Sequence, residues 1–205
     1  MLKFKEFPKL PRLSRAMVIT EKLDGTNSSI FIQAKVLEEE ENDPSIVAQN
    51  ESYTMRAGSR TRWITPKDDN YGFANWVKSN SEELFKLGEG HHFGEWWGSG
   101  IQRGYGLQKG DKRFSLFNTT RWRINSFEEK GFEAPPKCCH VVPELYSGPF
   151  DTTKIQEVLN ELIEHGSYAV DNFKNPEGIV IFHVAANLAF KKTCLKDETP
   201  KSLIE

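Results

Sequence analysis

Lys22-Leu23-Asp24-Gly25 is a short motif whose residue types suit covalent chemistry at phosphorus. A lysine amine attacks an α-phosphate only when it is neutral, whereas an ordinary lysine is charged at pH 7. Surrounding cations or a bound metal favour the neutral amine. The glycine would let the backbone approach a nucleotide. Four residues with one wildcard also arise by chance, so a surface lysine beside a hairpin turn explains the motif equally well.

Two downstream stretches carry groups that suit the same chemistry. Arg60 and Arg62 lie in one polar run, and guanidinium groups bind phosphate or ribose oxygens, although either arginine also fits a solvated loop. Glu95 stands between a glycine and two tryptophans, where a ribose hydroxyl could bind its carboxylate. The alternative is a glutamate that faces solvent from an edge strand.

Three later positions complete the set of candidate residues. Phe117 ends an alternating strand and could stack on a base, although phenylalanine at strand spacing usually belongs to a core. Glu177 precedes a buried strand, where its carboxylate could bind a divalent metal. Lys191 and Lys192 follow an apolar strand, so they predict either a phosphate contact or a solvated strand end.

The elements that must position these residues are mostly strands. Alternation and β-branched content predict strands over residues 17–20, 28–36, 53–58, 92–97, 113–117, 139–145, 178–183 and 188–191. Helices are expected over 71–87 and after Asp151, where the apolar residues fall on one face and Gly166 follows the end. Asp24-Gly25 predicts a tight turn between two strands, and the acidic segment 38–50 a solvated connection. The pattern favours an α+β fold with antiparallel sheets and one domain over residues 1–205.

Composition sets wide limits on the partners. The 205 residues include 27 basic and 29 acidic side chains, and this net charge of −2 argues mildly against a nucleic-acid binder. Without the acidic residues 38–41 the remainder is slightly basic, so a local basic groove is possible. Cys138, Cys139 and Cys194 lack the paired spacing of a zinc site, which favours reduced thiols. With no signal peptide or membrane span in the sequence, we expect a soluble, cytoplasmic protein without a membrane partner.

Taken in chain order, from about residue 20 to residue 193, these motifs resemble the nucleotidyltransferase motifs of polynucleotide ligases and mRNA capping enzymes. They most resemble those of the ATP-dependent RNA ligases. The resemblance implies a nucleotidyltransferase (ATP-grasp-like ligase catalytic) fold, in which two antiparallel sheets with flanking helices enclose the nucleotide. It also implies ATP and Mg²⁺ (or Mn²⁺) as cofactors.

The resemblance implies three catalytic residues. Lys22 resembles the lysine that becomes lysyl-AMP, Glu177 the metal-linked acid, and Lys191 the lysine that contacts the α-phosphate. RNA ligases often carry two lysines on one face of the last strand. Here Lys192 is adjacent to Lys191, and Thr193 stands where the second lysine would fall. We expect Lys192 to contact the nucleotide.

Five further positions are implied to bind the nucleotide or the incoming substrate. Glu95 resembles the acid that binds ribose and Phe117 the ring that stacks on adenine, while Glu21 helps to recognise adenine. Asn27 matches a position that contacts phosphate or incoming substrate. Arg60 resembles the arginine of the second motif, and Arg62 is the alternative for that role.

The function implied is ATP-dependent joining of RNA 5′-phosphate and 3′-hydroxyl ends, as in RNA repair, through lysyl-AMP and an adenylylated RNA end. The run from Gly94 to Gln102 resembles an extension common in RNA ligases. A minimal DNA ligase, a GTP-dependent capping-type enzyme and a catalytically silent nucleotide- or RNA-binding module are the alternatives. Only residues 193–205 follow the last motif, so we expect no C-terminal OB-fold, and a partner protein could supply end recognition.

The loop from Gly98 to Gly110 has no role in this set of motifs. It contains Arg103 and Tyr105 among glycines. One hypothesis is that Arg103 binds an RNA phosphate while Tyr105 stacks on a base. A flexible surface loop explains the same residues.

Overall fold

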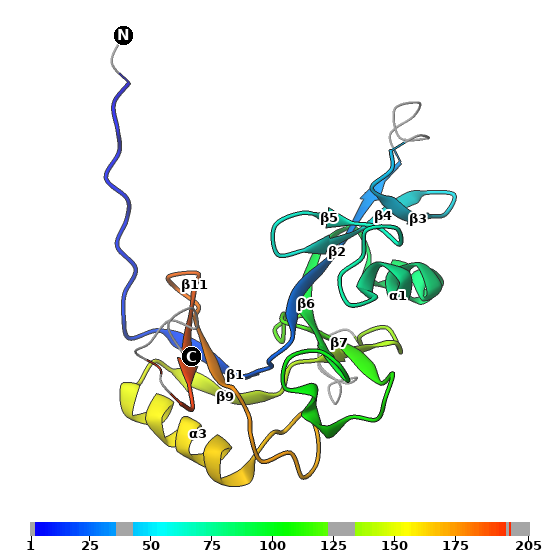
Figure 1. Cartoon of the computed structure of the whole chain (residues 1–205). Coiled ribbons are helices and arrows are strands. Elements are labelled where there is room, and N and C mark those ends of the chain that lie inside the picture. Colours follow the sequence, from blue (N-terminus) through cyan, green and yellow to red (C-terminus); the bar gives the residue numbers. More distant parts are fainter. Residues whose placement is uncertain (1–2, 36–42, 123–133, 196, 198–205) are drawn as a thin grey trace. The chain divides into compact units, whose positions relative to one another are not determined.

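The computed structural model describes residues 3–35, 43–122, 134–195 and 197. The chain forms two compact units (Figure 1). The first unit comprises Met1–Lys22 and Pro143–Glu205, and the second comprises Leu23–Val142. The expectation that they form one domain stays a prediction. Of the acidic connection expected over residues 38–50, residues 38–42 lie outside the described part of the chain.

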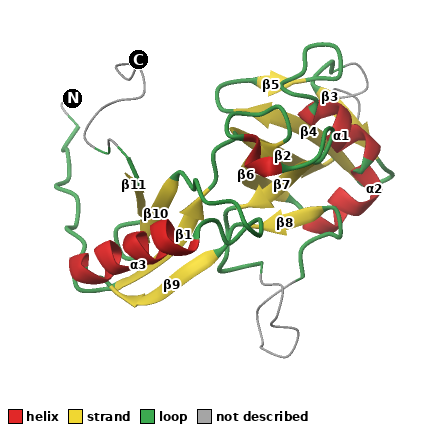
Figure 2. Cartoon of the chain, turned by 60° about the horizontal axis from the view of Figure 1, so that its bottom comes forward, coloured by secondary structure: helices red, strands yellow, loops and turns green. Residues whose placement is uncertain are grey.

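The first unit is a four-stranded antiparallel sheet with a helix on one face (Figure 2). Its strand order is β11-β10-β1-β9. The strands are β1 (Ala16–Lys22), β9 (Glu144–Pro149), β10 (Gly178–His183) and β11 (Leu188–Thr193). The helix is α3 (Thr152–His165), as the sequence predicted. Its first turn is capped by the Asp151 carboxylate, which accepts hydrogen bonds from the backbone of Thr153 and Lys154.

The core of the first unit lies between α3 and this sheet. Alternation along β1 buries Met17 and Ile19, while the same helical face of α3 buries Val158, Leu159 and Leu162. β1 is a central strand, because β10 pairs with one of its edges and β9 with the other. The residue at its end is therefore held by a sheet and not by a loop.

The second unit is a seven-stranded sheet in which β5 pairs beside β4. Along the main path the strand order is β3-β4-β2-β6-β7-β8. Its strands are β2 (Thr26–Ala34), β3 (Ile46–Gln49), β4 (Tyr53–Ser59), β5 (Trp63–Ile64), β6 (Gly90–Gly98), β7 (Lys112–Leu116) and β8 (Cys139–Val141). All pairs are antiparallel except β7 with β8, which is parallel. β3 and β5 were not expected from the sequence.

Helices cover one face of this second sheet. The helix expected over residues 71–87 is divided into α1 (Phe73–Ser79), α2 (Ser81–Leu84) and the 3-10 helix η1 (Phe85–Leu87). The division falls at Asn80, whose backbone is not helical. The apolar residues of these helices pack with Ile30 and Ile32 of β2. These helices therefore do not cover the other face of the sheet.

Two sequence predictions about connections are wrong. Asp24-Gly25 does not close a hairpin, because β1 and β2 belong to different sheets. Gly25 lacks the positive φ that a two-residue hairpin turn requires, and Leu23 and Asp24 are buried. The single strand expected over residues 139–145 is two strands, β8 and β9, which also belong to different sheets.

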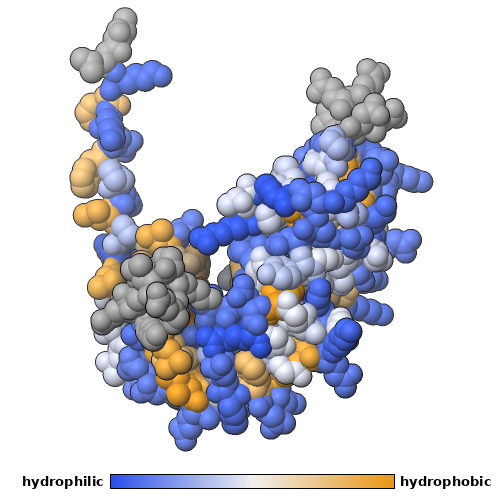
Figure 3. Space-filling view, in the orientation of Figure 1, coloured by the Kyte–Doolittle hydropathy of each residue, from blue (hydrophilic) through white to orange (hydrophobic). Residues whose placement is uncertain are grey.

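Apolar side chains are exposed along the N-terminal segment of the first unit. Phe4, Phe7, Leu10 and Leu13 are each at least two-thirds exposed, and Figure 3 shows orange atoms along this segment. Of the helices formed by the described residues, none has the length and apolar character needed to cross a membrane.

Candidate functional site

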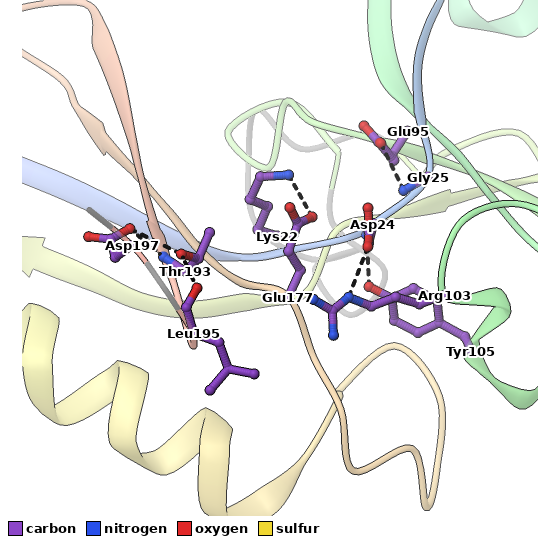
Figure 4. A network of polar contacts seen from close by, with 10 residues as sticks. All are labelled: Lys22, Asp24, Gly25, Glu95, Arg103, Tyr105, Glu177, Thr193, Leu195 and Asp197. Carbon is purple, nitrogen blue, oxygen red and sulfur yellow. Dashed lines mark hydrogen bonds and ion pairs between the residues drawn. The ribbon is translucent and has the colours of Figure 1, made fainter. Parts of the chain in front are cut away.

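Lys22 is the last residue of β1 and contacts a carboxylate of the same unit. Its Nζ donates a hydrogen bond of 2.7 Å to Oε2 of Glu177 (Figure 4). The Glu177 side chain is 3% exposed, whereas that of Lys22 is 23% exposed, so a ligand can still reach the amine. The described partner of the amine is an anion, whereas the sequence led us to expect cations around it. The geometry places the candidate nucleophile beside a carboxylate that could take its proton.

The register of the sheet decides which lysines of β11 share a face with Lys22. Lys22 is opposite Gly178, and Gly178 is opposite Thr193. Since alternate residues of a strand point the same way, Lys191 shares this face with Thr193 and Lys22. Lys192 is opposite Ile179 and points to the other face, where its Nζ lies 3.8 Å from Asp197. The structure therefore brings Lys191, and not Lys192, to the face that carries Lys22.

Glu21 precedes Lys22 and is almost fully buried on the opposite face of β1. Its carboxylate accepts hydrogen bonds from the Ser167 hydroxyl at 2.6 Å and from the backbone of Tyr168 at 2.7 Å and Ala169 at 3.2 Å. Burial raises the pKa of Glu21, and these hydrogen bonds oppose the shift. The carboxylate thus fixes the chain segment after α3 to the strand. Its expected role in adenine recognition stays a prediction.

Glu177 is also the carboxylate expected to bind a divalent metal. Across the described residues, His, Cys, Asp and Glu side chains form no group of three or more that could hold a metal ion. Mg²⁺ does not require one, since it is usually bound by one or two carboxylates and completes its shell with water and substrate phosphates. The donor set therefore fits an ion that arrives with nucleotide phosphates.

In the second unit, Glu95 and Gly25 are joined directly. The Gly25 amide donates a hydrogen bond of 3.1 Å to Oε1 of Glu95. A Cβ at Gly25 would lie 2.4 Å from the Trp96 carbonyl oxygen and 2.7 Å from Cβ of Trp97. Glycine is thus required here by the close approach of β6. This packing explains the glycine without a nucleotide, so the expected approach of a nucleotide to the backbone stays a prediction.

Asp24 is held by the loop after β6, through contacts that the sequence did not predict. Nε of Arg103 donates a 2.8 Å hydrogen bond to Oδ2 of Asp24, and the Tyr105 hydroxyl accepts one of 2.8 Å from the Asp24 amide (Figure 4). Tyr105 lies in the 3-10 helix η2 (Gly104–Gly106), is 1% exposed and packs edge-on against Trp97. The predicted stacking of Tyr105 on RNA is therefore wrong. The predicted phosphate contact of Arg103 stays a prediction.

Two of the remaining predicted residues, Asn27 and Glu95, lie on the sheet face of the second unit that is opposite α1. Asn27 of β2 is directly opposite Glu95 of β6, so these side chains share that face. Phe117 follows β7, and its amide donates to the Phe93 carbonyl at 3.0 Å. Phe117 is 39% exposed. Arg60 is exposed between β4 and β5.

Comparisons with known proteins give one family and related solved structures. The sequence matches the family described as RNA ligase over residues 15–196. Curated protein sequences give no significant match. A lysine-to-alanine mutant of a Naegleria gruberi RNA ligase, solved with ATP and Mn, is 17% identical with a TM-score of 0.50. The alignment covers 87% of this chain and 48% of that chain.

A second solved structure, an apo lysine-to-alanine mutant of a Naegleria gruberi RNA ligase, is 18% identical with a TM-score of 0.48. That alignment covers 88% of this chain and 50% of the other. The chain thus spans about half the length of these ligases. With the ATP-bound structure it shares a mixed fold of two sheets and few helices. The family match extends over nearly the whole sequence, so the chain belongs to the RNA ligase family.

Proposed function

We propose that this protein is an ATP-dependent RNA ligase that joins 5′-phosphate and 3′-hydroxyl ends through a lysyl-AMP intermediate. The observation that carries the proposal is the contact of 2.7 Å between Nζ of Lys22 and Oε2 of Glu177 at the end of a central strand. Family membership and a likeness in fold to a ligase solved with ATP and Mn support it. The nucleotidyltransferase fold is part of the same proposal.

In the first step, the lone pair of the Lys22 amine attacks the α-phosphorus of ATP. A phosphorus–nitrogen bond forms, the bond to the bridging oxygen breaks, and pyrophosphate leaves. The amine must lose a proton, and Oε2 of Glu177 lies within hydrogen-bond distance to accept it. Lys191, which shares the sheet face of Lys22, neutralises charge on the α-phosphate. A bound Mg²⁺ would supply further charge neutralisation at the phosphates.

Two transfers complete the cycle. An oxygen of the RNA 5′-phosphate attacks the phosphorus of lysyl-AMP, the phosphorus–nitrogen bond breaks, and the amine is restored. The 3′-hydroxyl then attacks the 5′-phosphate phosphorus of the adenylylated end, loses its proton, and expels AMP. In this scheme the second unit binds the adenosine, with Glu95 on the ribose, Phe117 on the adenine, and Asn27 and Arg60 on phosphate or incoming substrate.

The test of the proposal is covalent labelling of the protein with [α-³²P]ATP, followed by ligation of labelled 5′-phosphate RNA. We expect label on the protein, its release by acid as AMP, and sealing of RNA ends. Equal labelling by GTP would favour a capping-type enzyme, and sealing of DNA but not RNA would favour a DNA ligase. Tight ATP binding without any covalent adenylate, in Mg²⁺ or Mn²⁺, would favour a catalytically silent binding module. A requirement for a partner protein would appear as labelling without sealing.

A further inference from the structure

Four aromatic side chains gather on the face of the second sheet that is opposite α1. They are Phe31 of β2, Trp63 of β5, and His91 and Phe93 of β6, and we call them the aromatic platform. The ring centroids of Phe31 and Trp63 are 5.8 Å apart, those of Phe31 and His91 5.5 Å, and those of His91 and Phe93 4.1 Å. The rings therefore form a continuous surface across three strands.

Sheet register explains why these rings meet. Phe31 is opposite His91, and Ser29 is opposite Phe93, so the side chains of β2 and β6 point to the same face. Trp63 joins from β5 because Gly58 of β4 is opposite it. A Cβ at Gly58 would lie 3.3 Å from the Trp63 ring and 2.5 Å from Oγ of Ser29. The missing side chain allows the indole to lie close to the sheet.

The platform is accessible, which is unusual for so many rings. Phe93 is 50% exposed and Trp63 41%, and His91 is also exposed. The helices of this unit pack on the other face of the sheet, together with Ile30 and Ile32. Core formation therefore does not account for these rings.

The platform carries no charge, and one arginine, Arg60, lies close to it in the sequence. Nε2 of His91 lies 3.0 Å from Oγ of Ser29, and burial lowers the pKa of His91, so the ring is neutral at neutral pH. Arg60 lies in the short connection between β4 and β5, three residues before Trp63. Within the described part of the chain its exposed guanidinium has no hydrogen bond or ion pair. Neutral rings, with an exposed arginine on the connection that leads to one of them, suit a ligand with both flat bases and phosphates.

We propose that the aromatic platform binds unpaired nucleotides of the RNA strand, whose bases stack on Trp63 and its neighbours. The proposal rests on the proposed ligase function, and it adds a base-stacking subsite for RNA. A single adenine offers only one plane, whereas the platform offers four rings on three strands. Single-stranded RNA presents successive bases that stack on aromatic side chains, largely without regard to sequence. A phosphate of the same strand would meet Arg60.

The experiment measures binding of the whole protein to a short, fluorescein-labelled single-stranded RNA by anisotropy, without ATP. Trp63→Ala should weaken binding about 5- to 150-fold, the range expected for loss of one stacked base. Trp63→Phe keeps an aromatic ring and should retain most of the affinity. Tyr71→Ala is the matched control, because Tyr71 is 47% exposed in the same unit but does not belong to the platform. It should bind RNA as the wild type does.

Two further measurements separate stacking from a purely structural effect. An abasic oligonucleotide of the same length should bind the wild type and Trp63→Ala equally, because it has no bases to stack. Of the five tryptophans only Trp63 is exposed. RNA should therefore quench the tryptophan emission of the wild-type protein, but not that of Trp63→Phe, which lacks this side chain. Unchanged RNA affinity in Trp63→Ala, or an equal loss with the abasic strand, would overturn the proposal.

The same preparations are tested for labelling by [α-³²P]ATP, which does not involve RNA. Failure of the wild type to label would count against the proposed ligase chemistry, while the RNA titrations would still decide on the platform. If Trp63→Ala lowered the affinity for ATP and not for RNA, the platform would be a nucleotide site and the proposal would be wrong. If Trp63→Ala did not fold, quenching of tryptophan emission by RNA would still decide, because the proposal requires it in the wild type and excludes it in Trp63→Phe.

Discussion

The two units hold their candidate residues in contrasting ways. In the first unit the two candidate carboxylates are buried and hydrogen-bonded. Glu177 accepts a hydrogen bond from Lys22, and Glu21 accepts hydrogen bonds from three donors of the segment after α3. In the second unit one sheet face presents exposed rings and an exposed guanidinium at Arg60. The first arrangement suits a reacting group that must be oriented, and the second suits contacts made only when a ligand arrives.

This difference suggests that chemistry and recognition are assigned to separate sheets. The residues proposed to react all belong to the first unit, whereas those proposed to bind adenosine and RNA belong mainly to the second. Substitutions of the candidate residues Lys22, Glu177 and Glu21 of the first unit should therefore change the rate of covalent transfer or the stability of the fold. Substitutions on the platform should change affinity for RNA and leave covalent transfer intact.

The largest effect is expected at Lys22, the proposed nucleophile of the first unit. Lys22→Ala removes the amine, so transfer of label from [α-³²P]ATP to the protein should fall more than about 1,000-fold, to background. Lys78→Ala, which removes an exposed lysine of α1, is the control and should label normally. Undiminished labelling of Lys22→Ala would refute the assignment.

Glu177 should come next. Glu177→Gln keeps the shape of the side chain but removes the acceptor that lies 2.7 Å from the Lys22 amine. Single-turnover adenylylation should slow about 100-fold or more, the usual effect of losing a positioned acid or base. Glu161→Gln, at an exposed position on α3, should leave the rate unchanged. Equal rates in the two variants would mean that Glu177 has no part in the first step.

Glu21 should affect stability. Glu21→Gln leaves three donors around a buried side chain with a poorer acceptor, so the free energy of unfolding in urea should fall by about 1–3 kcal/mol. Since burial raises the pKa of Glu21 above 4.5, the folded protein binds more protons than the unfolded chain between 4.5 and that raised value. Its contribution to stability therefore falls as pH rises through this window, and Gln should remove that dependence. An unchanged pH profile would contradict this account.

The smallest effect is expected at an ion pair of the second unit. Nη2 of Arg56 lies 2.8 Å from Oδ2 of Asp43, and hydrogen bonds from Arg56 and Ser45 lower the pKa of Asp43 from 3.8 to about 2. The contribution of ionised Asp43 to the stability of the fold is complete above pH 3.8 and is lost as pH falls through about 2.

Asp43→Asn should therefore cost about 0.5–1 kcal/mol of unfolding free energy at pH 7, and less at lower pH. The control is Asp68→Asn, which breaks a more exposed pair with Arg62 and should have no measurable effect. Equal losses in the two variants would show that burial of Arg56 adds nothing to the pair.

Much of the fold could be predicted from the sequence, because alternation and helical periodicity are local signals. The strand that ends at Lys22, the strand from Gly178 to His183 and the helix capped by Asp151 were found within a few residues of their bounds. The short strands β3 and β5 were missed, because a few residues carry too little periodicity.

No local sequence signal predicts that the chain passes from one sheet to the other after β1. Asp24-Gly25 has the composition of a hairpin turn, and only the pairing of β1 with β9 and β10 shows that it is a passage to another sheet. The same limit applies to the site. Motif order predicted Lys22 and Glu177, which the structure brings into contact. The hydrogen bonds that join Arg103 and Tyr105 to Asp24 could not be predicted, because they depend on the course of a loop that has no local sequence signal.

The chain order of the two units has a consequence for biosynthesis. Residues 23–142 are contiguous, so the second unit can fold as soon as they leave the ribosome. β1 must wait for strands made much later, since Lys22 and Glu177 are 155 positions apart. Closing so long a connection is slow, which makes docking of β1 a late event. A nascent chain would therefore form the proposed RNA-binding surface well before the amine of Lys22 is set in place.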